Sequence, residues 1–216
     1  MAVITKIESQ KKNKERVNIH IDGEYAFSAS AEIVYKEKIK SNMEVDEIRL
    51  EKIISEANYL KCKETSLRII TRSYKTESEM ENRLSEKGYD KKEIERTIGF
   101  LKEYKFIDNR AYAEMYVKDR LRSQGIQKIK YALLRKGIDE EEIEEVLSKV
   151  DRNSEEEVGV QLAIKKYKQL IKKEEDIQKR KNKLGMFLVS RGYEYSLVKE
   201  IVKDVVNMEA GGELWH

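Results

Sequence analysis

The chain has 216 residues, a net charge of +3 at neutral pH, and 39% each of charged and apolar residues. It has no proline, where average usage would give roughly ten, which favours a mostly helical fold; low genomic proline usage is the alternative. The single cysteine, Cys62, excludes an intrachain disulfide, and no apolar run approaches the roughly 18 residues that a bilayer span needs. With no signal peptide evident, these features predict a cytoplasmic protein without membrane contact.

The first part of the chain carries the β signal. Residues 17–21 and 25–28 alternate apolar and polar side chains, and Asp22-Gly23 joins the two runs. This dipeptide predicts a hairpin with a type I′ turn, whose central residues both need positive φ, and residues 3–7 could add a third strand. Because a lone hairpin is marginal in water, we expect it to pack on later apolar positions. These positions are Ile33, Val34, Ile39, Ile48, Ile53 and Ile54.

From Asp46 onward the pattern predicts helix almost throughout, with marked helix starts. A capping box pairs a Ser, Thr or Asp side chain with an amide three residues later, and a Glu there reaches back to the cap. The predicted pairs are Thr76 with Glu79, Asp90 with Glu93, Asp139 with Glu142, and Ser154 with Glu157.

Three segments, beginning at Met80, Ile129 and Leu184, can be laid over one another with their glycines in register. Gly88, Gly137 and Gly192 recur at intervals of about 50 residues, close to the period of helical repeat arrays. Each glycine follows a helix, where it takes the left-handed conformation at little cost. A further helix precedes each segment, so the sequence predicts three three-helix units.

The expected organisation follows from these units. An N-terminal β-hairpin region with helices occupies residues 1–58, three-helix repeats occupy 59–106, 107–152 and 153–210, and a flexible tail occupies 211–216. The third repeat is lengthened by the charged stretch 172–181, for which a longer helix and a mobile loop are both open.

Catalytic and metal-binding motifs are missing from the sequence. It contains neither GxxxxGK[ST] nor GxGxxG, and its histidines are only His20 and His216. One cysteine and two distant histidines do not form a zinc site of known spacing. The acidic runs, such as Glu140-Glu141-Glu142, are typical of solvated helix faces. We therefore expect a binding protein with no active site, metal or cofactor.

Charge is unevenly distributed. Residues 109–137 hold eight Lys/Arg and two acids, whereas residues 138–157 hold two Lys/Arg and ten acids. Cations near helix ends suit phosphates or an acidic protein groove, while a solvated basic face is the alternative. The candidate binding residues are Arg110, Lys118, Arg120, Arg122, Lys128, Lys130, Arg135 and Lys136.

Several motifs resemble the RecX family, whose members regulate the RecA recombinase. The SYKTESEM segment from Ser73, followed by Lys87-Gly88-Tyr89, is similar to the first repeat of that family. The hairpin with Asp22-Gly23-Glu24-Tyr25 is similar to the extension of Gram-positive members. The middle repeat carries the most specific match: YKFIDNRAYA from Tyr104, with Val117, Arg120, Gly125, Ile129, Leu133 and Lys136-Gly137-Ile138.

The resemblance covers nearly the whole chain and implies an elongated, curved array of three-helix repeats behind a small β region. It also implies binding in the groove of the RecA–DNA filament, with inhibition of RecA and effects on recombination, DNA repair and the SOS response. The resemblance further implies weak electrostatic binding to single- and double-stranded DNA. We expect the protein to be a monomer. Among the matching residues, Phe106, Ile107, Ala113 and Leu133 are expected in the core and Asp108 as an N-cap.

Two other functions stay open at this point. A stand-alone helical DNA-binding protein would use the same basic face without a filament. A helical scaffold would instead use that face to bind an acidic protein, and its binding would not depend on nucleic acid.

Overall fold

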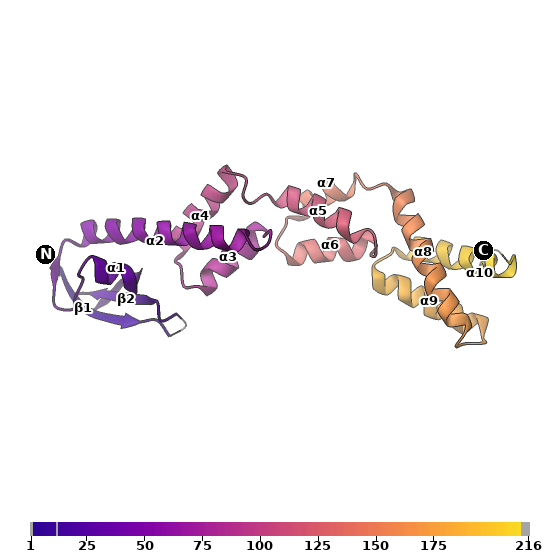
Figure 1. The fold of residues 1–216 in the computed structure, drawn as a ribbon, viewed down its shortest axis with the longest axis horizontal. Helices are drawn as coiled ribbons and strands as arrows, with labels where there is room; N and C mark the ends of the chain where they lie inside the picture. Colours follow the sequence, from indigo (N-terminus) through magenta and orange to yellow (C-terminus); the bar gives the residue numbers. More distant parts are fainter. Residues whose placement is uncertain (1, 12, 213–216) are drawn as a thin grey trace. The chain divides into compact units, whose positions relative to one another are not determined.

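The structure is a computed structural model that describes residues 2–11 and 13–212. The chain divides into two compact units, residues 1–108 and residues 109–216. Helices dominate both units, and the described strands all lie in the first (Figure 1). The predicted class is confirmed: a mainly α protein of tandem three-helix repeats with a small N-terminal β region.

The first unit begins with an antiparallel sheet whose strands lie in the order β3-β2-β1-β4. Asp22 and Gly23 connect β2 and β3 with φ values of 49° and 90°, which confirms the predicted turn. The third strand that the sequence allowed at residues 3–7 is present as β1. The bounds are β1 Ala2–Ser9, β2 Arg16–Ile21, β3 Glu24–Ser30 and β4 Glu44–Val45, and the short helix α1 (Ala31–Lys36) follows β3.

The long helix α2 (Glu47–Ile70) takes part in two cores. Its first half buries Ile54 against the sheet, and its second half buries Cys62 within the first repeat. The expected boundary between residues 58 and 59 therefore falls inside one continuous helix. Ile33 and Ile39 are buried as expected, and Val34 is partly buried.

Two of the expected sheet contacts are wrong, because Ile48 is 81% exposed and Ile53 is 37% exposed. Successive helix residues are about 100° apart around the axis. Ile48 and Ile53 therefore point away from the side of α2 that carries Ile54.

The first repeat comprises the second half of α2, α3 (Glu77–Glu86) and α4 (Lys91–Glu103). Both capping boxes predicted here, at Thr76 and Asp90, are confirmed. Gly88 has a φ of 83°, as its place after α3 requires. The core contains Cys62, Met80, Leu84, Ile94, Ile98, Leu101 and Ile107.

Phe106 does not join this core and is 41% exposed, contrary to expectation. The chain leaves α4 through Lys105, which has a φ of 55°, and the next residue to be buried is Ile107. The Phe106 ring lies instead beside Tyr104 and Phe100, with ring centroids 6.4 and 6.1 Å away.

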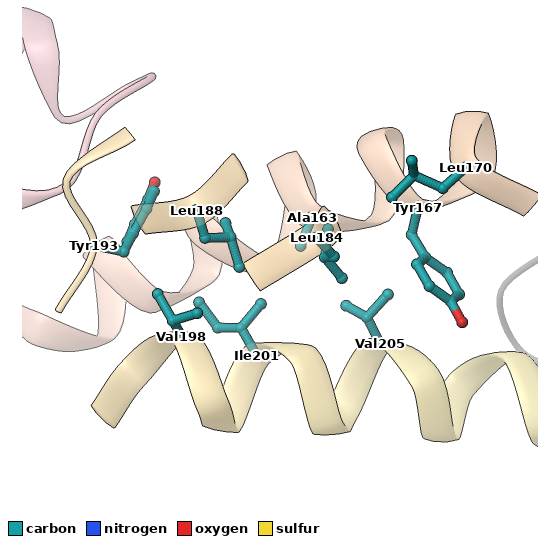
Figure 2. Packing of buried hydrophobic residues seen from close by; sticks show 9 residues of the cluster. All are labelled: Ala163, Tyr167, Leu170, Leu184, Leu188, Tyr193, Val198, Ile201 and Val205. Carbon is teal, nitrogen blue, oxygen red and sulfur yellow. The ribbon is translucent and has the colours of Figure 1, made fainter. Parts of the chain in front are cut away.

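The second unit holds the other two repeats. The second repeat comprises α5 (Asn109–Arg120), α6 (Ile126–Arg135) and α7 (Glu140–Leu147), and Asp108 directly precedes α5. Ala113 and Leu133 are buried in its core, as predicted. The third repeat comprises α8 (Arg152–Ile171), α9 (Ile177–Arg191) and α10 (Tyr195–Ala210). Figure 2 shows its buried side chains, which come from these three helices and, for Tyr193, from the turn between α9 and α10.

The start of α8 differs from the prediction. Its N-cap is Asp151, whose side chain accepts a hydrogen bond from the Asn153 backbone N–H, and Ser154 lies inside the helix. The Ser154 hydroxyl donates to the Asp151 carboxylate over 3.0 Å. Aspartate is as effective a cap as serine, so the helix begins one turn earlier and places Glu155 at the contact between repeats.

The charged stretch 172–181 is neither one long helix nor one loop. Residues 172–176 form the turn after α8, and α9 begins at Ile177 with Asp176 as its N-cap. Arg180 is buried and bonds Glu209 over 2.6 Å. Of the expected flexible tail, Gly211 and Gly212 form a turn, and residues 213–216, including His216, lie outside the described residues.

Backbone contacts join the second and third repeats. The Gly125 N–H donates to the Arg191 carbonyl over 3.0 Å, and the Gln127 N–H donates to the Gly192 carbonyl over 3.1 Å. Gly125 is the N-cap of α6 and has no side chain to accept from that helix. The Glu155 carboxylate of α8 supplies the missing acceptor, because it accepts a hydrogen bond from the Ile126 N–H over 2.8 Å. These bonds fix the α5–α6 turn, which carries Arg122.

Candidate nucleic-acid interface

Two of the eight predicted cations are paired with the acidic block that follows them. Lys130 bonds Glu140 at 2.7 Å and Glu144 at 2.9 Å, and these bonds raise the pKa of its ammonium group. Arg110 lies 3.0 Å from Glu145. Both side chains therefore connect helices within the second repeat, and a ligand would have to displace these carboxylates to reach them.

Lys128 has a structural position at the contact between repeats. Its ammonium group donates to the Ser190 carbonyl over 3.0 Å. Its backbone and Cβ also lie directly against Gly192. A side chain held between two repeats in this way is a weaker candidate for a ligand contact.

Arg120 and Lys136 lie over the tyrosines of α5. The Tyr112 and Tyr116 rings stack with centroids 6.1 Å apart. The Arg120 guanidinium lies 5.3 Å from the Tyr116 centroid, and the Lys136 ammonium lies 5.2 Å from that of Tyr112 and 5.9 Å from that of Tyr116. We call these four residues the tyrosine–cation cluster. Cation–π attraction holds both cations at one surface, and Arg120 also forms an ion pair with Asp119 at 3.5 Å.

Three further candidates are exposed: Lys118 on α5, Arg122 in the α5–α6 turn and Arg135 at the end of α6. The described residues provide no ion-pair partner for any of them. Their charges are therefore available to an anion, which is the property that a phosphate contact requires.

The tyrosines were not among the predicted site residues, although the sequence contains their signal. Tyr112, Tyr116 and Arg120 are spaced at i, i+4 and i+8, which places them on one face of a helix. Aromatic rings interleaved with cations suit a nucleic-acid strand, whose phosphates meet the cations and whose bases stack on rings. The same surface would also suit an acidic protein.

The titratable groups with shifted pKa values have structural roles. Burial raises the pKa of the Cys62 thiol to about 11, which suppresses the reactive thiolate. Burial also raises the pKa values of Glu93 and Glu155, which accept hydrogen bonds from backbone N–H groups at the starts of α4 and α6. In the described part of the chain, no group of His, Cys, Asp and Glu could hold a metal ion, and no helix could cross a membrane.

Fold and surface together define a helical-repeat protein with a basic, aromatic-containing face. Four family models match it: the N-terminal domain of regulatory protein RecX over residues 2–46, and the first, second and third three-helix domains of RecX over residues 62–101, 108–147 and 154–202. The chain belongs to the RecX family.

Curated relatives and a solved structure agree with this assignment. Regulatory protein RecX of Clostridium beijerinckii is 47% identical over 209 residues, covering 97% of this chain and 98% of the relative. Regulatory protein RecX of Clostridium tetani is 48% identical over 203 residues, covering 94% of each chain. A crystal structure of a regulatory protein RecX superposes with a TM-score of 0.65 at 29% identity, covering 94% of this chain and all of the other.

Proposed function

We propose that this protein regulates RecA by binding in the groove of the RecA–DNA filament, and that it does so in the cytoplasm as a monomer without chemistry of its own. The observation that carries the proposal is the tyrosine–cation cluster, together with membership of the RecX family. The cluster places two cations beside two aromatic rings that offer stacking surfaces, so it suits a nucleoprotein surface that presents both phosphates and acidic side chains.

Bound protein would slow DNA strand exchange and ATP hydrolysis by RecA, because it would lock RecA protomers on DNA or dislodge them from it. The consequences would reach recombination, DNA repair and the SOS response. The available cations Lys118, Arg122 and Arg135 would add long-range attraction to the polyanion, which is weakened by salt.

The test measures DNA-dependent ATP hydrolysis by RecA from the same organism, with this protein added below equimolar amounts. We expect inhibition by the natural sequence and weak inhibition by the Arg120→Gln, Lys136→Gln double variant. The matched control is Lys172→Gln with Lys173→Gln, which removes the same charge from the α8–α9 turn and should inhibit normally. Helical circular dichroism should be unchanged in both variants.

The results also separate the alternatives. If the natural sequence leaves the RecA rate unchanged, regulation through the filament is wrong. If excess free DNA abolishes the inhibition, the protein acts as a stand-alone DNA-binding protein. A scaffold for an acidic protein would show little DNA binding even at low salt, where phosphate contacts are strongest.

A further inference from the structure

The first unit contains a basic cavity that none of the predicted site residues lines. Its volume is about 690 Å³, and its walls come from four segments distant in sequence. These are the β1–β2 loop with the first residue of β2, the start of α1, the second half of α2 with the turn after it, and the α3–α4 turn. The charged lining residues are the cations Lys14, Arg16, Lys61, Arg68, Arg72 and Lys87 and the carboxylates Glu15 and Glu32.

Hydrogen bonds hold the walls in place. The Asn13 side-chain amide donates to the Lys87 carbonyl over 2.7 Å, which ties the β1–β2 loop to the α3–α4 turn. The Tyr89 hydroxyl bonds the Thr65 hydroxyl over 2.9 Å and donates to the Lys61 carbonyl over 3.2 Å, which ties that turn to α2. The cavity is therefore part of the folded unit and does not depend on one mobile loop.

Arg16 is the buried cation of the cavity and is only 3% exposed. Its guanidinium lies 4.8 Å from the Tyr89 ring centroid and donates through Nη2 to the Ser28 hydroxyl over 2.9 Å. Its Nε is buried and has no hydrogen-bond partner among the described residues. Protein atoms enclose this Nε, so it does not contact the cavity itself. Arg16 contributes its positive charge to the wall, where it is held by Ser28, whose hydroxyl donates in turn to the Asp90 carboxylate over 2.8 Å.

The remaining charges make the cavity strongly positive. Glu32 is taken by Lys61, with which it forms an ion pair at 3.2 Å. The exposed cations Lys14, Arg68, Arg72 and Lys87 have no ion-pair partner within the described ranges. Convergent cations repel one another, and this repulsion is relieved when an anion binds between them.

We propose that this cavity binds consecutive phosphates of a nucleic-acid strand; the idea that this strand belongs to a RecA filament rests on the proposed function. The cations lie on several walls of the cavity, and a chain of phosphates can contact several walls at once, whereas one small anion cannot. Guanidinium groups such as those of Arg68 and Arg72 match phosphate oxygens in a bidentate manner. An acidic peptide is disfavoured because most lining residues are charged or polar and only Ala31, Ile69 and Tyr89 are apolar or aromatic, whereas protein interfaces have apolar centres.

The experiment measures binding of a fluorescently labelled oligothymidylate to the full chain by anisotropy across a salt series. The cavity variant is Arg68→Gln with Arg72→Gln. The control, Arg49→Gln with Lys52→Gln, removes two exposed cations from the start of α2, the helix that carries Arg68 near its end, and both lie outside the cavity. For the cavity variant we expect the log–log salt slope to fall by about 1.4, since each lost contact to a single strand contributes about 0.7. Affinity should then fall about 25-fold at 0.1 M salt if binding at 1 M is equal. The control should bind like the natural sequence.

A second double variant keeps the test decisive if the first one does not fold. Lys14→Gln with Lys87→Gln removes two lining charges from the loop and the turn without altering α2, and it should give a similar loss. The inference is overturned if both cavity variants match the control in affinity and slope. It is also overturned if polyglutamate displaces the labelled strand as well as unlabelled oligothymidylate does, since the cavity would then recognise carboxylates.

The same variants in the RecA assay separate this inference from the proposed function. If the natural sequence inhibits RecA while the cavity variants bind DNA normally, the cavity assignment fails alone. If the natural sequence has no effect on RecA while the cavity variants still lose DNA affinity, the cavity assignment stands and the proposed function fails.

Discussion

Gly125 and Gly192 lie in different repeats, yet a side chain at Gly125 would overlap the Gly192 carbonyl group. A Cβ there would also lie 2.6 Å from the Tyr193 backbone nitrogen. All three contacted atoms belong to the backbone, which cannot rotate away as a flexible side chain does. The second and third repeats therefore meet through their main chains, and glycine at position 125 is a requirement of that contact.

Gly125→Ala should therefore lower the free energy of unfolding by about 1–3 kcal/mol, as overpacking commonly does. The matched control is Gly99→Ala in α4, where an added Cβ meets nothing within 4 Å. That change should stabilise the protein by about 1 kcal/mol, because alanine is the better helix former. Urea unfolding of both variants tests the pair, and equal effects would contradict the close approach.

Glu155 should make stability depend on pH. Burial raises its pKa above the ordinary 4.5, while the hydrogen bond from the Ile126 N–H opposes this shift. Because the folded state binds the proton more tightly than the unfolded chain, the charged form costs stability at neutral pH. That cost is recovered as the pH falls through the folded pKa toward 4.5.

The natural sequence should therefore gain stability relative to Glu155→Gln as the pH is lowered from 7 toward 4.5. Chemical unfolding of both proteins at a series of pH values measures this difference. A difference that stays constant with pH would show that Glu155 has the same pKa in the folded and unfolded states.

Leu133 lies in the core of the second repeat and is fully buried. Leu133→Ala should lower the free energy of unfolding by about 2–5 kcal/mol, because it removes buried methyl groups and leaves a cavity. Tyr131→Ala on the same helix is the control, since that side chain is 63% exposed and should cost far less. A near-neutral result for Leu133→Ala would contradict the orientation of α6, in which Leu133 faces the core.

Arg180 forms a buried ion pair with Glu209, which also accepts a hydrogen bond from the Tyr167 hydroxyl over 2.8 Å. Arg180→Ala should cost about 3 kcal/mol, because it leaves a largely buried carboxylate without its partner. Arg83→Ala breaks the exposed pair with Glu86 and should change stability by less than about 0.5 kcal/mol. Thermal melts of the two variants provide the comparison, and similar losses would mean that burial does not strengthen the Arg180 pair.

Features governed by neighbouring residues were predictable from the sequence. The Asp22-Gly23 turn, the capping boxes at Thr76 and Asp90, and the left-handed glycines depend on φ preferences and on hydrogen bonds within a few residues. Ser154 shows the limit of such rules, because Asp151 is an equally good cap and the contact of Glu155 with the second repeat favours the earlier start.

The candidate site was predictable only in part. The sequence located the basic segment, and its helical spacing contained the Tyr112–Tyr116–Arg120 face. The sequence did not reveal that Lys130 forms ion pairs with Glu140 and Glu144, because counting charges does not show which carboxylate lies next to which cation in the folded protein.

By itself, the sequence determined the repeats, their turns and their apolar faces, because these follow from periodicity and local backbone preference. Only the tertiary structure decided which cations stay available and which become structural. It also assembled the basic cavity of the first unit, whose cations Lys14, Arg68, Arg72 and Lys87 lie on three separate segments. Ion pairing and cavity formation depend on distances between segments far apart in the chain, and those distances exist only after the helices and the sheet have packed.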